Sequence, residues 1–134
     1  MGKFIKSFVR GTWQVQRAFS PAVVVEGSFK TVYVAGHTGQ TADDGASLAD
    51  DFDAQCRQTF KNIERTLSEA GAKLSDLVTL TVFLIDTRHT TRMTEIRTEI
   101  FGKDFPASAA ITVAGFASPA MMIEIQGVAV IAAS

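Results

Sequence analysis

The stretch Val78-Thr-Leu-Thr-Val-Phe-Leu-Ile85 decides the fold, because it predicts a β-strand with two largely apolar faces. Successive side chains of a strand point to opposite faces, so Leu80 and Val82 share one face while Phe83 and Ile85 share the other. A strand that is apolar on both faces belongs in the interior of a sheet. We therefore place residues 78–85 in the middle of the sheet.

A long amphipathic helix is predicted upstream of this strand. It begins at Ser47, with Asp50 three residues later as a weak capping box, and it ends at Gly71, which suits a left-handed C-cap. Its apolar residues recur at spacings of four, four, three and four: Phe52, Cys56, Phe60, Ile63 and Leu67. On this stripe Cys56 is interpreted as a small buried hydrophobic residue.

Shorter elements complete the chain on either side. Strands are predicted at 23–26 and 31–35 as a hairpin, and at 109–113 and 122–131, while a second helix begins at about Thr91. The order is β-β-α-β-α-β-β, an α+β fold with a mixed sheet and both helices on one face. No third helix is predicted, so the other face of the sheet needs a different cover.

Composition limits the classes of function. The 134 residues suit a single domain spanning 1–134, with 1–18 as an N-terminal extension or strand. A net charge of -1 argues against nucleic acid as a partner, and no apolar run approaches the length of a membrane span. A lone cysteine fits a reducing, cytoplasmic location. Hydrophobic residues reach 46%, more than a small monomer needs, which points to a subunit interface.

Two residues stand out as candidates for chemistry. Glu124 lies in an almost uncharged strand, so it is either a functional carboxylate in a cleft or a residue that faces solvent or an interface. His37 follows a strand and is flanked by Gly36, which suits either ligand binding or a plain exposed turn. There is no phosphate loop, dinucleotide fingerprint or zinc motif, and neither a cofactor nor a metal is expected.

Several short motifs occur in an order that is specific as a set. They are Phe19-Ser-Pro-Ala22, Val34-Ala-Gly-His-Thr-Gly-Gln40, Gln55-Cys-Arg-Gln-Thr-Phe-Lys-Asn-Ile63, Glu69-Ala-Gly71, Phe105-Pro-Ala107 and Ile123-Glu-Ile125. Over residues 19–131 the chain resembles the RidA/YjgF family, the reactive-intermediate deaminases also called L-PSP endoribonucleases. The resemblance implies a chorismate-mutase-like fold, a homotrimer that covers the bare sheet face, and small-molecule clefts between subunits.

The resemblance also assigns roles, although this chain departs from the family at several positions. Glu124 matches the family's water-activating glutamate, and Ser108 stands where deaminases keep a carboxylate-binding arginine. The expected ligand-binding residues are Phe19 in place of a tyrosine, Gly36, the inserted His37, Glu95 near an asparagine position, Ser108, and Ala110 in place of a cysteine.

The loss of the arginine shapes the functional hypothesis. A serine hydroxyl lacks the charge of a guanidinium fork, so standard 2-imino-acid deamination is not expected unless Arg92, Arg97 or His37 supplies a cation. The leading hypothesis is a divergent imine or enamine deaminase or hydrolase in which Glu124 activates water. The alternative is a non-catalytic trimeric protein that binds a small ligand. Ribonuclease activity has little electrostatic support.

Overall fold

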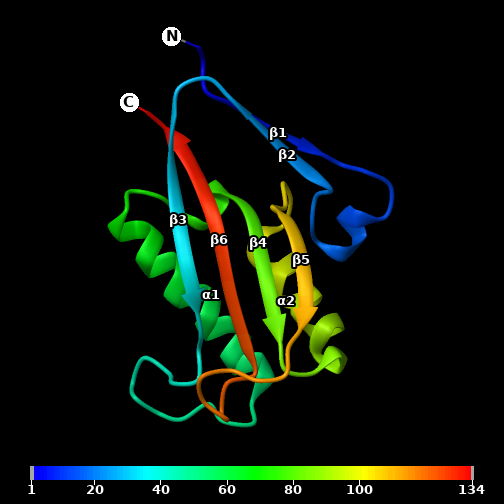
Figure 1. Cartoon of the computed structure of the whole chain (residues 1–134), viewed down its shortest axis with the longest axis vertical. Coiled ribbons are helices and arrows are strands. Elements are labelled where there is room, and N and C mark those ends of the chain that lie inside the picture. The colour runs from blue at the N-terminus through cyan, green and yellow to red at the C-terminus, as the bar shows by residue number, and fades with distance from the viewer. Residues whose placement is uncertain (1, 134) are drawn as a thin grey trace.

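The main feature of the computed structural model, which describes residues 2–133, is a four-stranded mixed sheet in the order β3-β6-β4-β5 (Figure 1). The strands are β1 (Ile5–Val9), β2 (Ala22–Glu26), β3 (Phe29–His37), β4 (Leu77–Leu84), β5 (Ala107–Thr112) and β6 (Ile123–Ala132). The helices are α1 (Phe52–Glu69) and α2 (Thr90–Phe101), with short 3-10 turns η1 (Gln14–Arg17), η2 (Leu74–Asp76) and η3 (Thr87–His89). The central position of β4 is confirmed, since it pairs parallel with β5 and antiparallel with β6.

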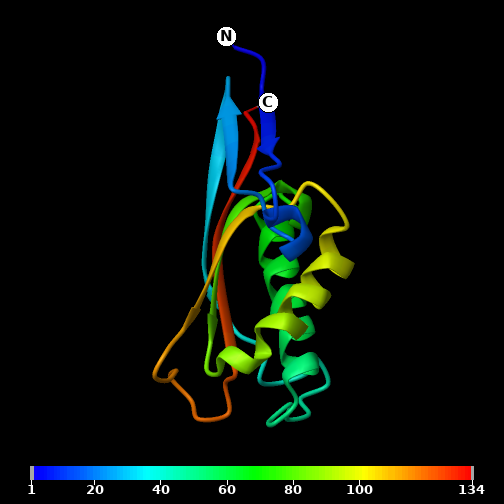
Figure 2. The ribbon, with the colours of Figure 1, turned by 90° about the vertical axis from the view of Figure 1, so that its right-hand side faces the viewer.

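Both helices cover the same face of this sheet, which confirms the α+β fold (Figure 2). The core lies between α1 and the sheet, where Phe60, Ile63 and Leu67 pack with residues of β4 and β6 that are almost fully buried. Cys56 is completely buried in this core, and burial raises the pKa of its thiol to about 12. Its interpretation as a small hydrophobic residue is therefore confirmed.

The predicted hairpin between the first two strands is wrong. Strand β2 pairs antiparallel with the additional N-terminal strand β1, whereas β3 pairs with β6 in the main sheet. The chain turns at Gly27, whose φ of 95° suits glycine and whose Cα lies so close to the backbone of Lys3 that a side chain would overlap it. The turn therefore divides the two strands between separate sheets.

The first helix begins five residues later than predicted. Asp51 is its N-cap, and the carboxylate accepts a hydrogen bond of 3.0 Å from the backbone N–H of Ala54. The hydroxyl of Ser47 accepts from the N–H of Ala49 instead, and Asp50 adopts a positive φ of 64° that a helix does not permit.

The other face of the sheet carries no helix (Figure 2). It leaves Tyr33 of β3 81% exposed, and the apolar residues Phe29 and Ile111 are also exposed. Among residues 2–133, no helix is both long and apolar enough to cross a membrane. The face without helices therefore carries exposed apolar side chains.

Candidate functional site

Glu124 lies on the bare face of the sheet. Its neighbours Ile123 and Ile125 are fully buried on the helix side, so the pleat directs Glu124 to the opposite side. In the register of the sheet it is paired with Phe83 of β4, which lies beside Ile111 of β5. The carboxylate is thus half-buried on a surface formed largely by apolar residues.

The backbone of β3 holds this carboxylate from one side. The pairing of β3 with β6 is interrupted between Val34 and His37, and this bulge brings Gly36 against Glu124. A Cβ atom at Gly36 would overlap the carboxylate and would lie 3.0 Å from its Cδ. Glycine is therefore required at position 36 for the observed placement of Glu124.

A buried glutamine fixes the start of β6 just before Glu124. The amide nitrogen of Gln55 on α1 donates to the carbonyls of Leu48 and Ala120, at 3.0 and 2.8 Å. Its amide oxygen accepts from the N–H of Met122 at 2.9 Å. Because Gln55 is fully buried, these three bonds hold the entry to β6 in one position.

A cavity of about 280 Å³ lies on the opposite side of the sheet, between η1, α2 and β5. It is lined by Trp13, Arg17, Phe19, Thr90, Met93, Thr94, Arg97, Ser108, Ala109 and Ala110. Ser20 holds the N-terminal wall in place, because its hydroxyl donates to the carbonyl of Phe105 at 2.6 Å and its N–H to the carbonyl of Pro106 at 3.1 Å. The rings of Trp13 and Phe19 meet edge to face, 5.6 Å apart.

Arg97 places a buried guanidinium beside Ser108 in this cavity. Its Nη1 donates to the hydroxyl of Ser108 at 2.8 Å, and its Nη2 donates to the carbonyl of Arg17 at 3.0 Å. The side chain is 3% exposed, and burial lowers the pKa of Arg97 to about 10, so it stays charged at neutral pH. A cation from α2 therefore lies next to the position where the resemblance led us to expect one from β5.

One copy of the chain does not bring Glu124 and this cavity together. Ser108 is aligned with Leu80, which is buried under the helices, whereas Glu124 is aligned with Phe83 on the bare face. Side chains of aligned residues share a face of a sheet, so the two groups lie on opposite sides. Of the residues predicted from sequence, Phe19, Ser108 and Ala110 line the cavity. Gly36 and Glu124 lie against each other on the bare face.

His37 and Glu95 lie outside both groups. The Nδ1 of His37 donates to the carbonyl of Ala35 at 2.7 Å, and its Nε2 lies 2.8 Å from the hydroxyl of Thr66 on α1. These contacts turn the ring toward the helix side and away from Glu124. Glu95 contacts Arg92 at 3.4 Å on the outer surface of α2.

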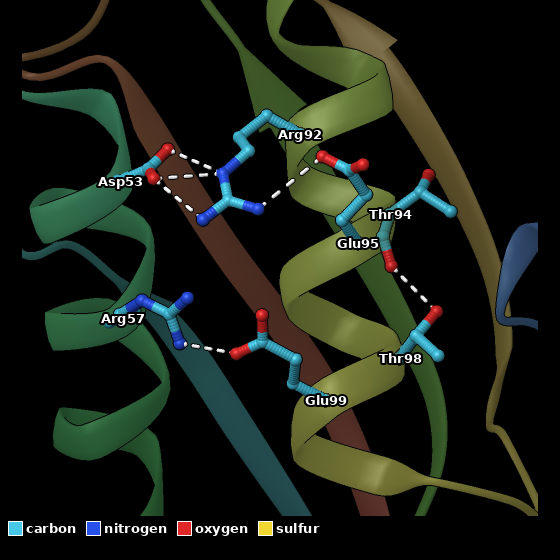
Figure 3. A network of polar contacts seen from close by, with 7 residues as sticks. All are labelled: Asp53, Arg57, Arg92, Thr94, Glu95, Thr98 and Glu99. Carbon is cyan, nitrogen blue, oxygen red and sulfur yellow. Dashed lines mark hydrogen bonds and ion pairs between the residues drawn. The ribbon is translucent and has the colours of Figure 1, made fainter.

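Arg92 also lies outside the cavity and forms ion pairs on the surface between the two helices (Figure 3). Its Nε donates to both carboxylate oxygens of Asp53, at 2.8 and 2.9 Å, and the guanidinium holds the pKa of that carboxyl below its usual range. Arg57 and Glu99 form a second bridge of 2.8 Å between the helices. Of the three candidate cations, Arg97 alone contacts Ser108.

Six lining residues were not assigned to the site from sequence: Trp13, Arg17, Thr90, Met93, Thr94 and Ala109. Thr94 follows Thr90 by four residues and precedes Arg97 by three, so all three share one helix face. Arg97 itself follows Met93 by four residues, and both are buried residues of α2. This spacing was the signal that Arg97 is buried. Nothing comparable distinguishes Trp13 or Arg17.

We expect Gly36→Ala to lower any activity that uses Glu124 by about 100-fold, because the new methyl group displaces the carboxylate by about 1 Å or more. The matched control is Gly115→Ala, since a Cβ at Gly115 meets nothing within 4 Å. The measurement is kcat for both variants beside the unmodified chain. Full activity of Gly36→Ala would contradict the assigned position of Glu124.

No cluster of three or more metal-ligating side chains is found within residues 2–133.

The comparisons with known proteins agree on one family. The model of the family described as endoribonuclease L-PSP matches residues 12–131. A RutC family protein from Pyrococcus abyssi is 33% identical over 83% of this chain and 84% of its own length. The human protein named 2-iminobutanoate/2-iminopropanoate deaminase is 31% identical over 84% of this chain and 79% of its own.

Solved structures extend the likeness to the fold. A Rid family protein of unknown function from Yersinia pestis has a TM-score of 0.82 and 25% identity, covering 94% of this chain and 98% of its own. RidA from an Antarctic Psychrobacter has a TM-score of 0.69 and 31% identity, covering 84% and 88%. The chain therefore belongs to the endoribonuclease L-PSP family, the family of the RidA and YjgF proteins.

Proposed function

We propose that three copies of the chain form a homotrimer and that each cleft joins the bare face of one copy to the Arg97 cavity of the next. The observation that carries the proposal is the division of the site. Glu124 and the Arg97–Ser108 pair lie on opposite sides of one sheet, so only a second copy can complete the site. The exposed side chains of Phe29, Tyr33 and Ile111 give the bare face the apolar character of an interface.

In this cleft we propose hydrolysis of the imine or enamine of a small molecule. The carboxylate of Glu124 accepts a proton from water as the water oxygen bonds to the imine carbon. Glu124 then passes this proton to the imine nitrogen, which gives a carbinolamine. The hydroxyl proton of the carbinolamine moves to its amino nitrogen as the C–N bond breaks, so ammonia leaves and a carbonyl product remains. The human relative's name, an imino-acid deaminase, supports this class of reaction.

Arg97 supports the retention of an anionic substrate group. The sequence predicts loss of carboxylate binding because Ser108 replaces an arginine, yet the guanidinium of Arg97 lies 2.8 Å from the Ser108 hydroxyl. A charged donor at this place can hold a carboxylate through charge-assisted hydrogen bonds.

The reduced, buried thiol of Cys56 is in keeping with a cytoplasmic location.

The test is catalysis by the unmodified protein. Imines are generated in situ from amino acids by an amino-acid oxidase, and semicarbazide traps what is not hydrolysed. We expect the protein to slow semicarbazone formation in proportion to its concentration. No effect on any imine tested would reject the deaminase assignment. Saturable binding of the corresponding 2-oxo acid without turnover would favour the non-catalytic ligand-binding alternative.

A further inference from the structure

Within residues 2–133, Arg97 is a buried cation without an acidic partner. The side chain is 3% exposed, and its Nε has no hydrogen-bond partner within residues 2–133. Its two bonds go to a neutral hydroxyl and a neutral carbonyl, at Ser108 and Arg17. Burial of a charge without a counter-charge is costly, and a folded protein usually pairs such a group. The missing partner of Arg97 is therefore expected to come from a ligand.

A second arginine borders the cavity around Arg97. Arg17 also lines it, and the residue is adjacent to Arg97, which donates to its carbonyl. Among the described residues, those that line this cavity include these two arginines and no aspartate or glutamate. Two like charges that border one small space repel each other, and a ligand with two negative charges relieves that repulsion.

The two cations differ in depth. Arg97 is almost completely buried, whereas Arg17 is an exposed residue of η1. Of the five N–H groups of its guanidinium, Arg97 uses two, and its Nε has no partner within residues 2–133. The volume of about 280 Å³ accommodates a molecule of four or five carbon atoms. A short chain with an anionic group at each end would reach both arginines.

We propose that this cavity binds a small dicarboxylate, with one carboxylate on Arg97 inside the cavity and the other on Arg17 at its mouth. The inference rests on the proposed ligand cleft but not on the hydrolysis. A purely structural role for Arg97, as a link between η1 and β5, needs hydrogen-bond donors but no charge. A substitution of Arg97 that removes the positive charge but keeps an N–H donor therefore separates the binding role from the structural role.

The probes are succinate, succinamate and succinamide, which have the same number of non-hydrogen atoms and carry two, one and no negative charges. The single tryptophan of the chain, Trp13, lines the cavity, so its fluorescence reports binding directly. We expect the unmodified protein to bind succinate about tenfold more tightly than succinamate, and succinamate about tenfold more tightly than succinamide. Equal affinity for the three probes, or no binding of succinate, would overturn the proposal without any variant.

Three variants assign the charges to residues. Arg17→Gln should bind succinate no better than succinamate, while Arg97→Gln should lose at least tenfold affinity for both. Arg57→Gln is the matched control, because Arg57 is exposed, pairs with Glu99 and lies outside the cavity. Unchanged affinity of Arg97→Gln for succinate and succinamate would overturn the role of Arg97.

These experiments test the proposed dicarboxylate binding and the proposed imine hydrolysis separately. Succinate binding by a protein that hydrolyses no imine would reject the proposed function and keep this inference. Imine hydrolysis by a protein that does not distinguish the three probes would reject the inference and keep the function.

Discussion

Replacing Glu124 by glutamine is expected to lower kcat for imine hydrolysis by about 10²- to 10⁴-fold, the range that a positioned general base contributes. Glutamine has nearly the same shape as glutamate but cannot accept a proton from water. Gly36 and the fixed entry to β6 hold the side chain at position 124 in either case. The loss should therefore appear in kcat, with KM little changed.

The control for this substitution is Glu64→Gln, because Glu64 is an exposed carboxylate on α1. It should hydrolyse imines at the unmodified rate. Succinate should still bind to Glu124→Gln, since Arg97 and Arg17 are untouched. Undiminished hydrolysis by Glu124→Gln would remove Glu124 from the mechanism.

Replacing Tyr33 by aspartate is expected to abolish the proposed trimer. Tyr33 lies on the bare sheet face and is 81% exposed in the single chain, so a carboxylate there costs little before assembly. Assembly of the proposed trimer would bury that charge without a partner, which is strongly unfavourable. Light scattering should then report 14.4 kDa, one third of the mass expected for the proposed trimer of the unmodified chain.

Because the proposed site is divided between copies, this variant should also lose imine hydrolysis. Its circular dichroism should stay unchanged, since Tyr33 does not belong to the core between the helices and the sheet. Tyr33→Phe keeps the apolar ring and should remain trimeric. Glu64→Lys changes the charge on the helix-covered side and should remain trimeric too. A trimeric Tyr33→Asp would place the interface on another surface.

The sequence predicts those parts of the fold that depend on local periodicity. The double apolar faces of β4 and the stripe of α1 follow from side-chain spacing alone, and both agree with the structure. The partner of β2 could not be predicted in this way, because spacing does not say which strand pairs with which. Lys6 and Ser7 interrupt the apolar pattern of β1, so the sequence predicts residues 1–18 only as an extension or strand and does not identify them as the partner of β2.

The candidate site was predictable where a residue type conflicts with its surroundings. Glu124 is conspicuous because charge is rare within an apolar strand, and the structure places it on the bare face. Arg97 is less conspicuous, since charged residues are common on helices and most of them face solvent. Its burial depends on Ser108 and on the carbonyl of Arg17, which are distant in sequence and meet it only in the folded chain.

Because Cys56 is buried, the reactivity of its thiol reports how often the core opens. A thiol that is 0% exposed and has a pKa of about 12 cannot react with a disulfide reagent while α1 stays on the sheet. Because the chain contains one cysteine, each labelling event records one separation of α1 from β4 and β6. The rate of labelling thus measures how often the core opens locally. Any ligand that stabilises the closed structure should slow the labelling.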